Sequence, residues 1–223
     1  TVTLAVPLLL VTLLVGPLLV RLKAAYPRIR LFVLDDMSLR VQQAMVEGRA
    51  DLGILVDAPD IRGLKCQALA EEPMFLTGLD PEGAVPCSWQ DGECTVPFDV
   101  AASLPLVLQS PRFAIRQSVE RIAAARNRVL NIVHEHDSTR VIRSLHLAGA
   151  GYTFSPASSV LEHPVAQTGW LRARVVDPSM HRRYHLAQAA NRSPSEACVA
   201  VARLLTEQVR DLIGSRAWEA RLL

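Results

Sequence analysis

Hydrophobic positions at the start of the chain follow first a strand pattern and then a helical one. Val2, Leu4 and Val6 are apolar with no charge between them, which predicts a strand buried on both faces of a parallel sheet. Pro7 ends this predicted strand. Apolar residues then recur at helical spacing until Tyr26-Pro27 stops the helix, and they are Leu10, Leu13, Leu14, Leu18 and Leu22.

The same segment also has the length and composition of a membrane span. Residues 1–20 carry no charge, and two basic residues follow them closely. A signal-peptide core would look similar, but a basic start and a small-residue cleavage site are missing. Pro7, Gly16 and Pro17 are expected to break one continuous helix. We therefore favour an amphipathic helix, and keep as the alternative a membrane-anchored protein that is insoluble without detergent.

The pattern of strand followed by helix then repeats. A strand is predicted over 29–34, and Ser38 is placed to cap the next helix, whose buried side is Val41, Ala44 and Met45. Gly48 suits the turn that ends this helix. A third strand is predicted over 52–56. Alternating strands and helices of this kind indicate an α/β domain built on a parallel sheet.

Shorter apolar runs continue the alternation through the rest of the chain. A helix carrying Ile115 and Val119 and another carrying Ile142 are predicted, and a long helix runs from Ser195 to about Gly214. Residues 78–98 are rich in glycine, proline and acids, which predicts a surface loop with a short strand at most. Strands are predicted near 74–76, 106–108, 129–135, 152–155, 171–176 and 183–190.

Four segments of the chain share their order and spacing with a known family. The first is GPLLVRLKAAYPRIRL at 16–31, and the second is GRADLGILVD at 48–57, with a Gly-x-x-Asp-hydrophobic start to the third strand. LPLVLQSPRFAIR at 104–116 and AGAGYTFSPASSV at 148–160 follow. Each segment is weakly specific alone. Together, over nearly the whole chain, they resemble the effector-binding domain of LysR-type transcriptional regulators.

This resemblance implies an α/β fold of two Rossmann-like subdomains joined by two crossover strands, as in type 2 periplasmic binding proteins. Subdomain I is expected to be 1–75 with 188–223, and subdomain II 76–187. The resemblance also implies a cytoplasmic bacterial regulator that forms a homodimer or homotetramer and has no membrane partner. Its DNA contacts would come from an N-terminal helix-turn-helix domain that is absent from this sequence.

The effector is expected where strands give way to helix starts, because free backbone N–H groups and the helix dipole collect there. Arg112 and Arg116 add positive charge at one such turn, unless both are solvent-facing helix residues. The residues expected to bind the effector are Leu8, Leu9, Leu10, Ser38, Gln109, Ser110, Pro111, Arg112, Phe113, Asp137 and Ser138.

One of these positions departs from the family pattern. LysR domains usually carry Ser or Thr in the loop after the first strand, and here Leu9 stands where that hydroxyl is expected. Losing a side-chain donor weakens the hold on a carboxylate by about 0.5–1.5 kcal/mol. The departure therefore predicts an effector with more apolar character at this end, or a weak response to small acids.

Composition and motifs favour ligand binding over catalysis. The net charge is +2 and half of the residues are hydrophobic, with no run of basic residues suited to nucleic acid. No catalytic or phosphate-binding motif is present, so no enzyme activity and no cofactor are expected. Cys87 and Cys94 could form a disulfide or a metal clip, although two free thiols fit better. His134 and His136 could share a metal site, but no third ligand is evident, so none is expected.

The sequence therefore predicts a ligand-sensing regulatory domain that controls transcription. A small-molecule effector in the cleft between the subdomains would shift their relative placement and so the geometry of the oligomer. The alternative is a periplasmic solute-binding protein of a transport system, because the same fold serves both functions. A leader or lipoprotein cysteine upstream would favour that alternative, and a helix-turn-helix would favour the regulator.

Overall fold

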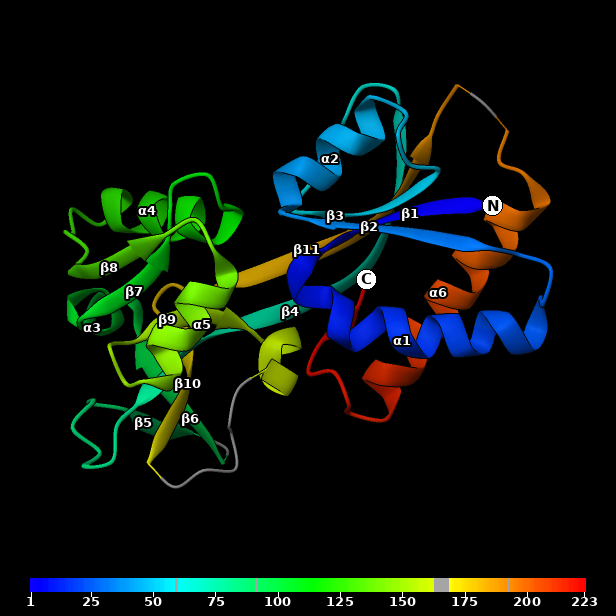
Figure 1. Ribbon diagram of the computed structural model, residues 1–223. Helices are drawn as coiled ribbons and strands as arrows, with labels where there is room; N and C mark the ends of the chain where they lie inside the picture. The colour runs from blue at the N-terminus through cyan, green and yellow to red at the C-terminus, as the bar shows by residue number, and fades with distance from the viewer. Residues whose placement is uncertain (59, 91, 163–168, 192) are drawn as a thin grey trace. The chain divides into compact units, whose positions relative to one another are not determined.

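The computed structural model describes residues 1–58, 60–90, 92–162, 169–191 and 193–223, and it divides into two compact units (Figure 1). Unit 1 comprises Thr1–Glu72 and Arg182–Leu223, and unit 2 is Pro73–His181. Two strands run across the boundaries between them, β4 (Leu64–Leu79) and β11 (His181–Ala189).

Unit 1 is a mixed sheet with helices on both faces. Strand β1 lies between β2 and β3 and is parallel to both, while β11 runs antiparallel to β3. The remaining edge is β4, to which the short β12 is added near the C-terminus. Besides β4 and β11, the elements are β1 (Val2–Pro7), α1 (Leu8–Ala25), β2 (Leu31–Asp36), α2 (Ser38–Val46), β3 (Leu52–Val56), α6 (Glu196–Gly214) and β12 (Arg221–Leu222).

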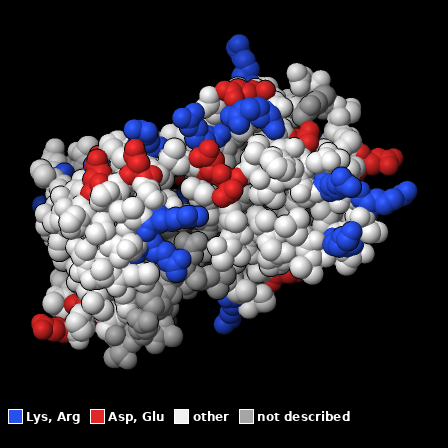
Figure 2. All heavy atoms as spheres, in the orientation of Figure 1, with Lys and Arg blue, Asp and Glu red and all other residues white. Residues whose placement is uncertain are grey.

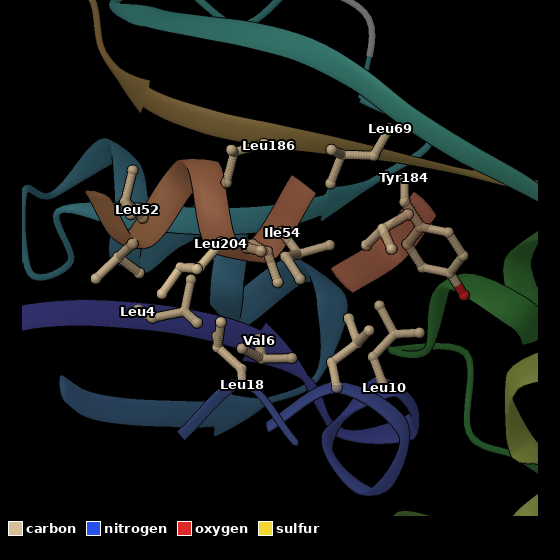
Figure 3. Close-up of a cluster of buried hydrophobic side chains, with 14 of the residues drawn as sticks. Leu4, Val6, Leu10, Leu18, Leu52, Ile54, Leu69, Tyr184, Leu186 and Leu204 are labelled. Carbon is tan, nitrogen blue, oxygen red and sulfur yellow. The ribbon is translucent and has the colours of Figure 1, made fainter. Parts of the chain in front are cut away.

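The main core of unit 1 lies between its sheet and the pair of helices α1 and α6 (Figure 3). Alternate residues of β1 point toward these helices, so Leu4 and Val6 meet Leu10 and Leu18 of α1 and Leu204 of α6. Ala5, on the other side of β1, packs in a second cluster with residues of α2. The period-two alternation of the strand thus serves both helical layers.

Helix α1 is continuous through Gly16 and Pro17, so the expectation that these residues break it is wrong. Pro17 removes one backbone donor from the helix, and nearby the buried amide of Gln208 donates to the Leu14 carbonyl at 2.8 Å. By length and composition α1 could cross a membrane. Its five buried leucines, however, are those that the helical spacing singles out, and all five belong to the core of unit 1.

Unit 2 contains two separate sheets. In one, β4 pairs antiparallel with β9 and β10, and β6 joins β10 to β5. The other is the parallel pair of β7 and β8. Its elements after β4 are β5 (Ser88–Gln90), β6 (Glu93–Pro97), α3 (Phe98–Ser103), β7 (Leu106–Gln109), α4 (Ala114–Ala125), β8 (Ile132–His136), α5 (Thr139–Leu147), β9 (Thr153–Pro156), the 3-10 helix η1 (Ala157–Glu162) and β10 (Trp170–Val176).

Some predicted boundaries differ from the structure. The second strand is Leu31–Asp36, two residues later along the chain than the predicted 29–34. Strand β8 begins at Ile132, later than predicted, and Val129 is fully solvent-facing. The segment 78–98, predicted as a loop, contains the end of β4 and the β5–β6 hairpin.

Two neighbouring glutamates of β4 bind groups from distant parts of unit 1. The Glu72 carboxylate is fully buried and accepts hydrogen bonds from the Tyr184 hydroxyl and from Trp218 Nε1, the latter at 2.7 Å. Glu71 accepts from Arg183 at 2.5 Å and from Arg221 at 2.9 Å. These contacts tie β4 to β11 and to the segment that follows α6.

Candidate functional site

In unit 1, two helices begin side by side at the carboxyl ends of parallel strands. The register places Pro7, the last residue of β1, opposite Asp36, the last residue of β2. Helix α1 begins directly at Leu8, without an intervening loop, and α2 begins at Ser38. The first-turn N–H groups of both helices lack partners within their helix, so they gather at one sheet edge.

The three leucines expected to bind the effector, Leu8, Leu9 and Leu10, differ in which of their atoms a ligand can contact. Leu10 is fully buried in the core, so only its backbone is available to a ligand. Leu8 and Leu9 are half-buried in the first turn. Neither helix has a side-chain cap at its start, because Pro7 and Met37 precede them. This edge therefore presents uncapped backbone donors beside two leucine side chains.

Ser38 does not cap α2, contrary to the sequence-based expectation, because it is the first residue inside the helix. Its Oγ instead accepts a hydrogen bond of 3.3 Å from Nη2 of Arg182. Strand β11 pairs with β3 such that Tyr184 is opposite Val56, so Arg182 extends past the end of β3. A buried arginine thus contacts the start of α2 at this edge.

Arg182 was missed by the sequence reasoning, although a signal was present. The burial of β11 alternates, with Arg182, Tyr184 and Leu186 inward and Arg183 outward. An arginine in phase with two large hydrophobic residues of a strand faces the interior. Arg183, out of phase, pairs with Glu71.

Unit 2 repeats the arrangement at the ends of β7 and β8. Gln109 is opposite His136 in the parallel register, and the Ser110 amide donates to the His136 carbonyl at 3.2 Å. The turns that follow are joined, because the Ser110 hydroxyl donates to the Asp137 carboxylate. Arg112 forms an ion pair of 3.2 Å with the same carboxylate. The structure therefore brings together the unit 2 residues that the sequence selected from two distant segments.

The two arginines of this turn are both engaged with acids. Arg116 is buried and binds Glu120 at 2.8 Å, Glu135 at 2.6 Å and the Gln109 carbonyl. Arg112 is 73% exposed and is held by Asp137. Arg116 is thus a structural link within the unit, and the positive charge of the turn is largely neutralised.

Two further polar groups at this edge differ in their hydrogen bonding. Oε1 of Gln109 is buried and has no hydrogen-bond partner among the described residues. Ser138, at the other turn, caps α5, since its Oγ accepts from the Val141 amide at 3.4 Å. Pro111 and Phe113 lie between Ser110 and α4, and Phe113 is the residue that precedes the helix.

Neither the histidine pair nor the cysteine pair is part of a metal site in the described part of the chain. Over the described residues, no group of three or more His, Cys, Asp or Glu side chains is arranged to hold a metal ion. His134 and His136 are both exposed on β8. Cys87 and Cys94 are free thiols, with Cys94 on β6 and Cys87 directly before β5 of the same hairpin. Burial, and then the hydrogen bond with Cys94, raise the pKa of Cys87 to about 12.

We expect Cys87 to resist alkylation at pH 7.5, because only a thiolate reacts and the raised pKa keeps this thiol protonated. Its modification by iodoacetamide, followed by mass spectrometry, should be at least about a hundredfold slower in the folded protein than in denaturant. Equal rates in both states would contradict the shielded thiol described here. Cys66, half-buried elsewhere, serves as an internal comparison.

Charged side chains are mixed rather than segregated on the face shown in Figure 2, where Lys and Arg lie among Asp and Glu. The face shown does not present the patch of one sign that a nucleic-acid interface needs. The mixing agrees with the small net charge of +2.

Comparisons with known proteins agree with this geometry. A family model described as LysR substrate binding domain matches residues 1–210. The nitrogen assimilation regulatory protein nac of Escherichia coli (strain K12) is 24% identical over 204 residues, which are 91% of this chain and 64% of that protein. This chain thus spans less than two thirds of that relative.

Solved structures show the same fold at low sequence identity. The Synechocystis PCC6803 CcmR regulatory domain in complex with 2-PG aligns with a TM-score of 0.80 at 15% identity, covering 95% of this chain and 98% of that one. The effector binding domain of QuiR in complex with shikimate gives 0.75 at 13% identity, covering 94% and 97%.

These matches confirm the predicted fold, two Rossmann-like subdomains with crossover strands, as in type 2 periplasmic binding proteins. They also confirm the predicted regulatory class, because the matched family consists of transcription regulators and not of enzymes. The chain belongs to the LysR family and is its substrate-binding regulatory domain.

Proposed function

We propose that this domain binds a small-molecule effector with groups from both units and thereby controls transcription. The observation that carries the proposal is the repeated edge: each unit has two helix starts beside two strand ends, with polar groups directed there. Such edges are where open α/β sheets bind ligands. Related domains have been seen with 2-PG and with shikimate, which supports an effector of metabolite size.

The mechanism we propose is a population shift. An effector that contacts both units favours one placement of unit 1 against unit 2. The free energy with which it can shift this equilibrium equals the difference between its binding free energies in the two placements. The response would be transmitted through a homodimer or homotetramer. DNA would be bound by another part of the full-length protein, inside the cell, as the family of transcription regulators implies.

Thermal unfolding against a metabolite panel tests the proposal. The panel includes aromatic and aliphatic carboxylates, amino acids, sulfur and nitrogen compounds, and nucleotides. A ligand at a hundred times its dissociation constant stabilises the folded state by about 2.7 kcal/mol. For a chain of 223 residues this raises the melting temperature by roughly 5–10 °C. A panel that leaves the melting temperature unchanged throughout would count against effector binding.

Leu9→Ser should strengthen the binding of carboxylates relative to uncharged ligands. The new hydroxyl would stand in the first turn of α1, and one hydrogen bond is worth about 0.5–1.5 kcal/mol, or roughly two- to tenfold in affinity. Titration calorimetry with the best carboxylate and best uncharged compound of the panel measures this preference. Leu19→Ser, later on the same helix, is the matched control, and an unchanged preference in Leu9→Ser would refute the prediction.

A further inference from the structure

We propose that Arg182 and the first turn of α2 form a subsite for an oxyanion, a carboxylate or phosphate group carried by the effector. This inference rests on the proposed function and narrows its ligand to an anionic metabolite. It reverses the expectation from Leu9 that the domain responds weakly to acids. The anion is recognised here by a buried guanidinium and a helix start instead of by a hydroxyl after β1.

The first observation is the burial of an unpaired charge. Arg182 is 6% exposed, and among the described residues its Nη1 has no hydrogen-bond partner. Its Nη2 donates to Ser38 Oγ at 3.3 Å, and its guanidinium carbon lies 5.6 Å from the centre of the Tyr184 ring. Neither contact supplies a negative charge. An arginine stays protonated at any physiological pH, so the charge persists.

The acidic groups of this region are committed elsewhere. Asp36 is exposed, and its Oδ1 accepts from the Met37 amide at 2.7 Å. Asp57 accepts from the Arg183 amide at 2.9 Å. The Glu72 carboxylate is bound by Tyr184 and Trp218. Because a buried cation without a counter-ion is strongly unfavourable, an anion brought by a ligand would satisfy a site that is already built.

The second observation is the start of α2, a helix of nine residues. The amides of Arg40 and Val41 already bind the Met37 carbonyl, whereas those of Ser38 and Leu39 precede the first helical hydrogen bond. No side chain caps this end. Since Ser38 Oγ accepts from Arg182, its own proton is left to donate. Backbone donors, a hydroxyl and a guanidinium therefore converge, which is a donor set suited to carboxylate or phosphate.

The arginines of unit 2 provide the contrast. Arg112 and Arg116 also lie beside a helix start, but each has a carboxylate within 3.2 Å. An added anion there would face Asp137 and Glu135. Over the described residues no acidic side chain forms an ion pair with Arg182, so the oxyanion is assigned to unit 1.

Three variants separate this subsite from a structural role. Arg182→Met and Ser38→Ala are compared with Arg210→Met, which removes the same charge from an exposed position on α6. Thermal unfolding is followed in Tris chloride at constant ionic strength. The probes are sodium phosphate, shikimate and benzoate. The methyl esters of shikimate and benzoate are tested beside the two acids. The effector panel is repeated on all variants.

We expect at least one oxyanion to raise the melting temperature of the unaltered chain and of Arg210→Met. In Arg182→Met the concentration of that oxyanion needed for half of the maximal rise in melting temperature should increase about tenfold to a hundredfold, since a hydrogen bond to a charged group is lost. Ser38→Ala should give a smaller rise. Without ligand, Arg182→Met should melt no lower than the unaltered chain, because a buried, unpaired charge has been replaced by an apolar side chain.

Two results would overturn the subsite. One is an Arg182→Met variant that melts lower than the unaltered chain yet keeps its response to oxyanions, which would make Arg182 a structural residue. The other is a panel in which only uncharged compounds stabilise the protein, which would leave the proposed function standing and remove this inference. A response to phosphate and not to the carboxylates, or the reverse, identifies which oxyanion the subsite takes.

Discussion

Replacing Glu72 with alanine should destabilise the domain by about 2–6 kcal/mol. The substitution leaves the Tyr184 hydroxyl and Trp218 Nε1 as buried donors without their acceptor, and each such group costs about 1–3 kcal/mol. For a chain of 223 residues the melting temperature should fall by roughly 5–25 °C. Urea denaturation monitored by circular dichroism gives the free energy of unfolding directly.

The neighbouring residue is the matched control. Glu71→Ala removes the same charge from the same strand, but its partners Arg183 and Arg221 are largely exposed and can be hydrated instead. The decrease in the free energy of unfolding should therefore be smaller for Glu71→Ala, about 1 kcal/mol. Glu72→Gln, which keeps one acceptor oxygen, should fall between the two. Both carboxylates are buried, so equal losses at 71 and 72 would show that the buried donors Tyr184 and Trp218 have no special role.

Leu18→Ala should lower the free energy of unfolding by about 2–5 kcal/mol, the usual range for a fully buried leucine. Val20→Ala, two residues later on α1, should change it by less than about 0.5 kcal/mol, because Val20 is 72% exposed. The measurement is again urea denaturation without detergent. If both substitutions had the same effect, α1 would not be packed in the core as described, and the membrane-anchored alternative would regain support.

Local patterns predicted unit 1 well because its apolar positions face fixed neighbours. Strand β3 was predicted with its observed limits. The leucines of α1 that are buried are the same ones that the helical spacing in the sequence selects. The hairpin of β5 and β6 was missed because its sequence is rich in residues that are typical of loops. Strands β5 and β6 pair antiparallel, and the sequence between them contains an Asp-Gly dipeptide, which is itself a hairpin signal.

The candidate site was predictable only in part. Proximity in sequence located the turns at Gln109–Phe113 and Asp137–Ser138, but the bond between Ser110 and Asp137 depends on the register of β7 against β8. Arg182 lies 144 residues from Ser38, and only the pairing of β11 with β3 brings them together. Contacts of that kind come from sheet topology, which local periodicity does not encode.

The discontinuity of unit 1 has a consequence for the order of events on the ribosome. Strands β1 to β3 are synthesised first, but α6 and Trp218, which complete their core, follow only after the 109 residues of unit 2. About 140 residues separate the end of β3 from the start of α6, so at about 5–20 residues per second the first strands wait roughly 7–30 s for these partners. Unit 2, being one continuous segment, can fold in that interval. The nascent chain therefore carries an uncovered apolar sheet for seconds, which makes it a natural client for a ribosome-associated chaperone.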